Sequence, residues 1–133
     1  MFLKFHHIGI ACYNIKEEIE SISKIHTVIE VSPVVMDTEQ KAELCILKTL
    51  DGIVIELIAG EQVKNILRKK ITYYHLCFET DDIDSEIDRL LNLGGFLISE
   101  PKPAILFENR KVAFIQVSYG IIELVQSYYN SCL

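Results

Sequence analysis

The pattern of hydrophobic and polar residues predicts a β-strand followed by an α-helix at two places in the chain. Residues 4–11 and 73–80 have the pattern of strands, and each is followed by a helix-capping residue, Asn14 or Asp82. Apolar residues then recur at helical spacing, at positions 15, 19 and 22 in the first copy and at 83, 87, 90 and 91 in the second. The glycines at 94 and 95 end the second predicted helix.

Three further strands are predicted after each helix. They cover residues 28–35, 43–50 and 53–59 in the first half, and residues 96–99, 111–118 and 121–126 in the second half. We therefore expect a βαβββ module, used twice within a single domain spanning residues 1–133. The modules cover 1–60 and 73–127, a helical linker covers 61–72, and a tail covers 128–133.

The two halves also match residue by residue when the second is shifted by 68 positions. The stretch His7-Ile8-Gly9-Ile10 then falls on His75-Leu76-Cys77-Phe78, and Gly52 falls on Gly120, with no gap between them. Past that glycine, the segment ending at Glu56 is one residue longer than the segment ending at Glu123. Two copies of this size indicate a duplicated module rather than a solenoid.

The period of a strand sorts the candidate ligands by face. His7 shares a face with Gly9, whereas His6 points the other way, and the repeat pairs His7 with His75. Glu56 and Glu123 each lie inside a strongly apolar strand, where a lone ionised carboxylate is costly to bury. A histidine and a glutamate supplied twice are best explained by one shared divalent metal ion.

Composition and charge narrow the classes of function. The chain has 133 residues, half of them hydrophobic, with 13 basic and 19 acidic residues and a net charge of -6. Nucleic-acid binding is disfavoured, because its affinity comes from neutralising phosphates. An apolar run of the roughly 18 residues needed for a membrane span is absent, as is a signal-peptide core, so we expect a cytoplasmic protein. The four cysteines, Cys12, Cys45, Cys77 and Cys132, follow no disulfide pattern and are expected to be reduced.

Several segments together resemble the vicinal oxygen chelate superfamily, which includes glyoxalases, bleomycin-resistance proteins and dioxygenases. They are His-His-Ile-Gly-Ile-Ala at 6–11, Ile-Glu-Leu-Ile at 55–58, Tyr-His-Leu-Cys-Phe-Glu-Thr-Asp-Asp-Ile at 74–83, Arg-Lys-Val-Ala-Phe-Ile at 110–115 and Ile-Ile-Glu-Leu-Val at 121–125. Within the superfamily, the sequence is most similar to methylmalonyl-CoA epimerases and glyoxalase I-like proteins.

This resemblance implies an α+β fold, in which two tandem βαβββ modules form an open, cup-shaped, eight-stranded sheet with its helices outside. It also implies one divalent metal ion, Zn, Ni, Co or Mn, held by His7, Glu56, His75 and Glu123. Such an ion leaves two positions for adjacent substrate oxygens and makes the C–H bond beside a carbonyl acidic. Relatives commonly form dimers, so a homodimer is the inherited expectation.

Candidate bases follow from the same resemblance. Glu123 is the first choice, since its family counterpart can move away from the metal and accept the proton, and Glu56 could mirror it from the opposite side. Glu43 is a third candidate, because some epimerases place an acidic residue in the neighbouring strand. Weaker alternatives are Cys77 as a residue lining the cup and the segment 109–111 as a contact for an anionic substrate group.

Two hypotheses about function remain open from the sequence. The first is a metal-dependent lyase or isomerase that abstracts a proton beside a carbonyl or thioester, of glyoxalase I or epimerase type. The second is a metal-free binding protein, similar to the members of the superfamily that sequester antibiotics. The complete set of two histidines and two glutamates favours the enzyme, because a metal-free binder does not need buried carboxylates at those positions.

Overall fold

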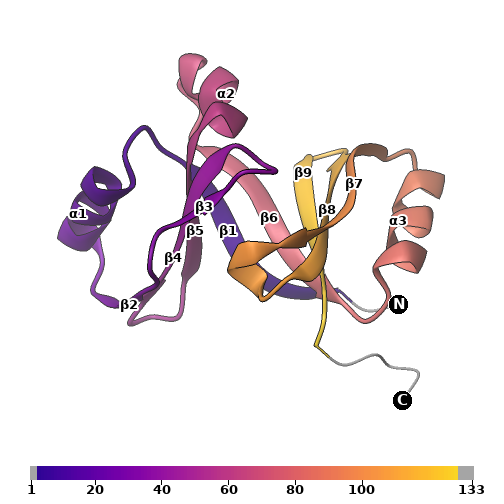
Figure 1. Ribbon diagram of the computed structural model, residues 1–133, viewed down its shortest axis with the longest axis horizontal. Helices are drawn as coiled ribbons and strands as arrows, with labels where there is room; N and C mark the ends of the chain where they lie inside the picture. The colour runs from indigo at the N-terminus through magenta and orange to yellow at the C-terminus, as the bar shows by residue number, and fades with distance from the viewer. Residues whose placement is uncertain (1–2, 129–133) are drawn as a thin grey trace. The chain divides into compact units, whose positions relative to one another are not determined.

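The computed structural model describes residues 3–128, which Figure 1 colours by residue number. The chain divides into two compact units. Among the described residues, the N-terminal unit runs from residue 7 to residue 74, and the C-terminal unit consists of residues 3–6 and 75–128. The boundaries therefore fall inside two strands, β1 (Lys4–Ala11) and β6 (Tyr73–Thr80). Within residues 3–128, no helix is long and apolar enough to cross a membrane.

The sheet of the N-terminal unit has the strand order β2-β4-β5-β1, with β3 also paired to β4. After β1 come α1 (Ile15–Ile25), β2 (Val28–Val31), β3 (Val35–Asp37), β4 (Ala42–Thr49) and β5 (Val54–Gly60). The pair β1–β5 is parallel and the other pairs are antiparallel. The short helices η1 (Glu61–Val63) and α2 (Lys64–Arg68) follow β5, in the expected linker.

Helix α1 covers one face of this sheet. It begins at Asn14, whose side-chain oxygen accepts a hydrogen bond from the backbone N–H of Glu17 at 2.9 Å. Its apolar side packs on a cluster that includes Cys45 and Leu47 of β4 and Leu57 of β5. Because side chains alternate along a strand, the residues between these positions, including Glu56, face the other way.

The sheet of the C-terminal unit has the strand order β6-β9-β8-β7. After β6 come α3 (Ile83–Asn92), β7 (Phe96–Ala104), η2 (Ile105–Phe107), β8 (Arg110–Val117) and β9 (Gly120–Gln126). The pair β6–β9 is parallel, like β1–β5 in the other unit. Helix α3 lies beside β7 and β8 in Figure 1 and buries its apolar side against a core formed by Ala113, Ile115, Ile122 and Leu124.

The α+β class predicted from the sequence is confirmed, but the strand count differs. Residues 3–128 contain nine strands rather than eight, because the predicted strand 28–35 is interrupted between β2 and β3. The interruption contains Pro33, which has no backbone N–H to donate. Next to it, the Ser32 hydroxyl accepts a hydrogen bond from the N–H of Ile46 at 2.9 Å.

The seventh strand is also longer than predicted. The sequence predicts a strand over 96–99, whereas β7 continues to Ala104 through Pro101 and Pro103. Its pairing with β8 shifts register twice, between Leu97 and Ser99 and between Ser99 and Lys102. Such irregularities let an edge strand accommodate proline, which is why the strand does not end at Pro101.

Candidate functional site

In the N-terminal unit, a histidine and a glutamate meet on the face of the sheet turned away from α1. Gly9 of β1 lies directly opposite Glu56 of β5, and His7 is two residues before Gly9 on the same face. His7 Nε2 is 3.5 Å from Glu56 Oε1. Both residues are buried, with 0% of His7 and 3% of Glu56 exposed.

The C-terminal unit contains the equivalent pair. Cys77 of β6 lies opposite Glu123 of β9, and His75 is two residues before Cys77. His75 Nε2 is 3.1 Å from Glu123 Oε1, and both residues are buried. The ring of Phe114 on β8 meets the His75 ring edge-on, with 5.4 Å between the centroids.

The two pairs have the same register, so the duplication visible in the sequence extends to three-dimensional geometry. In each unit a parallel strand pair brings the glutamate opposite the second residue after the histidine. The one-residue difference in spacing arises just before the last strand of each unit: Gly52 and Ile53 precede β5, whereas Gly120 is already the first residue of β9. Each unit therefore places its histidine beside its glutamate in the same way.

The donor atoms of each pair have a spacing that suits two ligands of one metal ion. For metal–ligand bonds of about 2.1 Å, adjacent donors are about 3.0 Å apart in an octahedron and about 3.4 Å apart in a tetrahedron. The observed separations of 3.1 Å and 3.5 Å lie close to these values. Imidazole nitrogen and carboxylate oxygen are also ligands that Zn, Ni, Co and Mn accept.

Glu43 occupies a different face from Glu56. In the β4–β5 pairing Glu43 lies opposite Ala59, whereas Ile46 lies opposite Glu56. Glu43 thus shares the α1 side of the sheet with Cys45 and is exposed at the end of its strand. The structure therefore places Glu43 on the opposite face of the sheet from His7 and Glu56.

Arg110 is engaged within the C-terminal unit. Its Nη1 lies 3.5 Å from Glu79 Oε2 and donates a hydrogen bond to the backbone oxygen of Gln126 at 3.2 Å. Its guanidinium carbon lies 3.9 Å from the centre of the Tyr128 ring. His6 Nε2 lies 3.9 Å from the other oxygen of Glu79. Arg110 and His6 thus both contact Glu79, in a charged and aromatic cluster of the C-terminal unit.

Among the described residues, Cys12, Cys45 and Cys77 are buried and none of them is in a disulfide, whereas Cys132 lies outside the described residues. Burial and the nearby charge of Glu18 raise the pKa of the Cys12 thiol from 9.0 to about 12. Cys12 and Glu18 line a cavity of about 420 Å³ next to Leu67 and Lys70. A thiol with so high a pKa is a poor nucleophile near neutral pH.

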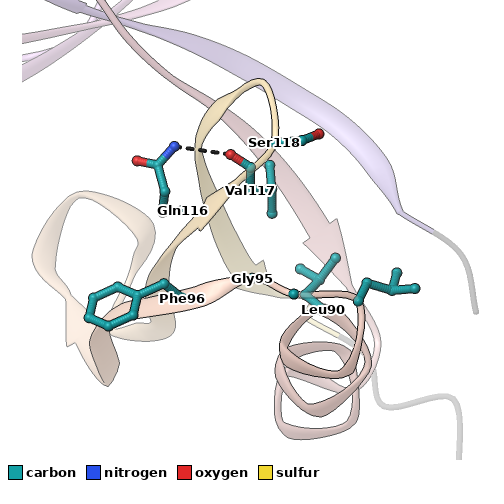
Figure 2. A pocket seen from close by; sticks show the side chains of 8 residues that line it. Leu90, Gly95, Phe96, Gln116, Val117 and Ser118 are labelled. Carbon is teal, nitrogen blue, oxygen red and sulfur yellow. Dashed lines mark hydrogen bonds between the residues drawn. The ribbon is translucent and has the colours of Figure 1, made fainter.

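A second cavity, of about 370 Å³, lies where α3 ends and β7 begins (Figure 2). Leu90, Phe96 and Gln116 surround it in Figure 2, and Gln116 Nε2 donates a hydrogen bond to the backbone oxygen of Val117 at 3.0 Å. None of the candidate ligands or bases named from the sequence lines this cavity.

Phe114 is a site neighbour that the sequence reasoning did not single out. Alternation along β8 places it on one face, but only the pairing of Phe114 with Glu123 reveals that this face carries the His75–Glu123 pair. In the sequence, Phe114 stands out only as an apolar residue of a predicted strand, at the position that the repeat matches to Ile46. That position does not by itself identify the residue that it faces on the neighbouring strand.

The fold and the two His–Glu pairs define a duplicated α+β protein with a metal-compatible donor set. A sequence profile of the Glyoxalase/Bleomycin resistance protein/Dioxygenase superfamily matches residues 6–114, which is most of the chain. The protein therefore belongs to this superfamily, as its sequence motifs predicted. A sequence comparison with curated proteins gives no significant match.

Solved structures share the fold at low sequence identity. Methylmalonyl-CoA epimerase from Mycobacterium tuberculosis is similar with a TM-score of 0.76 and 22% identity, over 92% of this chain and 87% of that one. A hypothetical protein from Bacillus halodurans gives 0.74 and 20%, over 98% and 99%. A variant of the Streptomyces coelicolor methylmalonyl-CoA epimerase in complex with 2-nitronate-propionyl-CoA gives 0.72 and 20%, over 96% of each chain. At these identities the likeness establishes the fold alone.

Proposed function

We propose that this protein is a divalent-metal-dependent isomerase or lyase that removes a proton beside a carbonyl or thioester group. His7, Glu56, His75 and Glu123 would hold the ion, each offering one nitrogen or oxygen ligand. Membership of the superfamily supports the proposal, as does the structural likeness to proteins described as methylmalonyl-CoA epimerases.

The observation that carries the proposal is the duplicated, buried pair of histidine and glutamate. A buried carboxylate is costly unless a cation or a proton neutralises it, and here two such carboxylates occur at equivalent positions. One divalent cation neutralises both, while the histidines bind it in their neutral form. A single ion thus accounts for all four residues, whereas separate roles for the two pairs leave the duplication unexplained.

The chemistry follows from the residues that the chain supplies. When bound, a divalent ion acts as a Lewis acid that makes the C–H bond beside a substrate carbonyl more acidic. The two histidines would hold the ion in place, and the burial of both His–Glu pairs keeps bulk water away from it. The carboxylate of Glu123 or Glu56 then accepts the substrate proton and returns it. An acyl thioester and a hemithioacetal both contain the required C–H bond.

Elemental analysis of protein purified without added metal tests the metal site. We expect about one equivalent of divalent metal per chain in the wild type, and loss of that metal in His75→Ala and Glu123→Gln. His26→Ala is the matched control, because His26 ends α1 and is part of neither pair. Absence of metal from the wild-type protein would contradict the proposal and favour the metal-free binding protein.

Deuterium uptake from solvent tests the reaction. We expect at least one member of a panel of α-substituted acyl thioesters and glutathione hemithioacetals to gain deuterium at the carbon beside the carbonyl, because a reversibly removed proton exchanges even without net turnover. Mass spectrometry measures the label, and metal-stripped protein is the control. Equal labelling with and without metal across the panel would rule out the proposed reaction.

A further inference from the structure

The cavity of about 420 Å³ in the N-terminal unit is lined by the end of β1, the first turn of α1 and the chain at the end of α2. Two hydrogen bonds join these segments. The backbone N–H of Ala11 donates to the Thr72 oxygen at 2.7 Å, and the Tyr13 hydroxyl donates to the Leu67 oxygen at 3.2 Å. The cavity volume equals that of about 14 water molecules, so a ligand with roughly a dozen non-hydrogen atoms fits.

Two side chains of opposite charge line this cavity without neutralising each other. Glu18 lies in the first turn of α1, and Lys70 follows the end of α2. Within residues 3–128, neither of them forms a salt bridge with the other or with any further residue. Glu18 is partly buried, so its carboxylate has given up part of its hydration. A cationic group of a ligand would offset that loss.

The equivalent carboxylate of the other unit is neutralised by its own helix. The 68-residue shift places Glu18 on Glu86, in the first turn of α3. Glu86 is fully buried, and its Oε1 accepts a hydrogen bond from Arg89 Nε at 2.7 Å. The residue of α1 that matches Arg89 is Ser21, which brings no positive charge. Both copies thus contain the carboxylate, but only in the second does the helix supply its cation.

The other residues that line the cavity add no charge. Ala11, Cys12 and Leu67 are buried and offer mainly apolar surface. The Cys12 thiol stays protonated near neutral pH, because its pKa is raised to about 12. A ligand that fills the cavity therefore needs a positive group for Glu18, a negative group for Lys70 and an apolar part for the remaining wall.

We infer that this cavity binds an α-amino acid with an apolar side chain. The ammonium group of the ligand pairs with Glu18, its carboxylate pairs with Lys70, and its side chain packs against Leu67 and Ala11. None of the four candidate metal ligands lines the cavity, so this is a second site. The inference goes beyond the proposed function, and it is tested by binding alone.

Nuclear magnetic resonance titration of the full chain with three related probes tests the pairing of charges. L-Phenylalanine carries both charges, phenethylamine carries only the positive one, and hydrocinnamate carries only the negative one. We expect L-phenylalanine to bind with a Kd of about 1 mM or lower and to shift the backbone amide signals of residues 11–13 and 67–72. Absence of saturable binding would overturn the inference, as would shifts confined to His7, Glu56, His75 and Glu123.

Two variants remove the charges one at a time. Glu18→Gln and Lys70→Gln should each weaken L-phenylalanine binding by about tenfold or more, as loss of a charge-assisted hydrogen bond does. Glu18→Gln alone should weaken the binding of phenethylamine, and Lys70→Gln alone that of hydrocinnamate. Glu17→Gln and Lys69→Gln are the matched controls, because these neighbouring residues are exposed and do not line the cavity.

Unchanged binding of L-phenylalanine in Glu18→Gln and Lys70→Gln, or an equal loss in the two controls, would overturn the inference. Circular dichroism checks that each variant folds. If a variant does not fold, the wild type still decides the question, because L-phenylalanine should bind at least about tenfold more tightly than either singly charged probe. Equal affinities for the three probes would contradict the pairing of both charges. Either result leaves the elemental analysis of the metal site unaffected.

Discussion

At the scale of single residues, Cys12 shows how burial alters a side chain's chemistry. The thiol is 4% exposed and has Glu18 nearby, and both burial and this negative charge disfavour the thiolate. Its pKa is therefore raised from 9.0 to about 12. In the unfolded chain the thiol ionises at its ordinary value, so the unfolded state gains relative stability once the pH passes about 9.

The raised pKa predicts a specific pH dependence of stability. The contribution of the Cys12 thiol is fully present below the unfolded pKa and is lost progressively as the pH rises towards about 12. Between about pH 8 and pH 10.5, the wild type should therefore lose stability faster than Cys12→Ala, which lacks the titrating group. Urea denaturation at each pH measures this, and a constant difference between the two proteins would contradict the prediction.

At the scale of elements, the two long helices begin at equivalent caps of different chemistry. Asn14 caps α1 through one side-chain oxygen, whereas Asp82 caps α3 by accepting hydrogen bonds from the N–H of Ser85 at 3.1 Å and from its hydroxyl at 2.9 Å. The bond from the Ser85 N–H is the main reason that the pKa of Asp82 lies below its usual 3.8. One cap is thus ionisable and the other is not.

The difference between the caps predicts two distinct pH profiles. The stabilisation by Asp82 is present above the unfolded pKa of 3.8 and is lost as the pH falls through the lower folded pKa. The stability gap between the wild type and Asp82→Ala should therefore shrink between about pH 5 and pH 2.5. For Asn14→Ala we expect a gap of about 1 kcal/mol that stays constant. Urea denaturation measures both, and parallel profiles would contradict the prediction.

A close backbone approach at the end of β5 gives a second prediction at this scale. Gly60 has φ +119°, and a Cβ added there would lie 2.9 Å from the backbone oxygen of Lys41. Gly52 also has a positive φ, +93°, but a Cβ there would meet nothing within 4 Å. Gly52→Ala should cost about 1 kcal/mol of unfolding free energy from its backbone conformation alone, and Gly60→Ala clearly more. Equal losses of unfolding free energy in urea denaturation would show that the backbone at Lys41 moves aside at no cost in stability.

At the scale of the whole molecule, a metal held by residues of both units would link binding to folding. At a free metal concentration 100 times the dissociation constant, the unfolding free energy should rise by about 2.7 kcal/mol. Calorimetry with and without EDTA measures this rise, and His7→Ala and His75→Ala should each abolish it. A rise that persists when either histidine is removed would contradict a single shared ion.

The homodimer expected from the resemblance stays a prediction at the same scale. Sedimentation velocity on the purified protein checks it, with a dimeric species as the expected outcome. A single species at the monomer mass across the micromolar range would contradict it.

Much of the fold and of the candidate site could be predicted from patterns that run along the chain. Strand periodicity and the 68-residue repeat predicted two βαβββ modules and favoured His7 over His6 as a ligand, and the similar spacing of histidine and glutamate in each half suggested a duplicated pair. The structure brings His7 near Glu56 and His75 near Glu123. These features are predictable because alternation and duplication depend on sequence order alone.

Only the tertiary structure decided which residues face one another across strands. It placed Glu43 on the α1 side, divided the strand at Pro33, and put Cys77 and Phe114 around Glu123 while leaving Gly9 opposite Glu56. Register between distant strands depends on packing over the whole sheet, and a shift by one residue moves every side chain to the other face. The sequence therefore determined the types of the candidate ligands and their duplication, whereas the pairing of strands determined which residues flank each of the two glutamates.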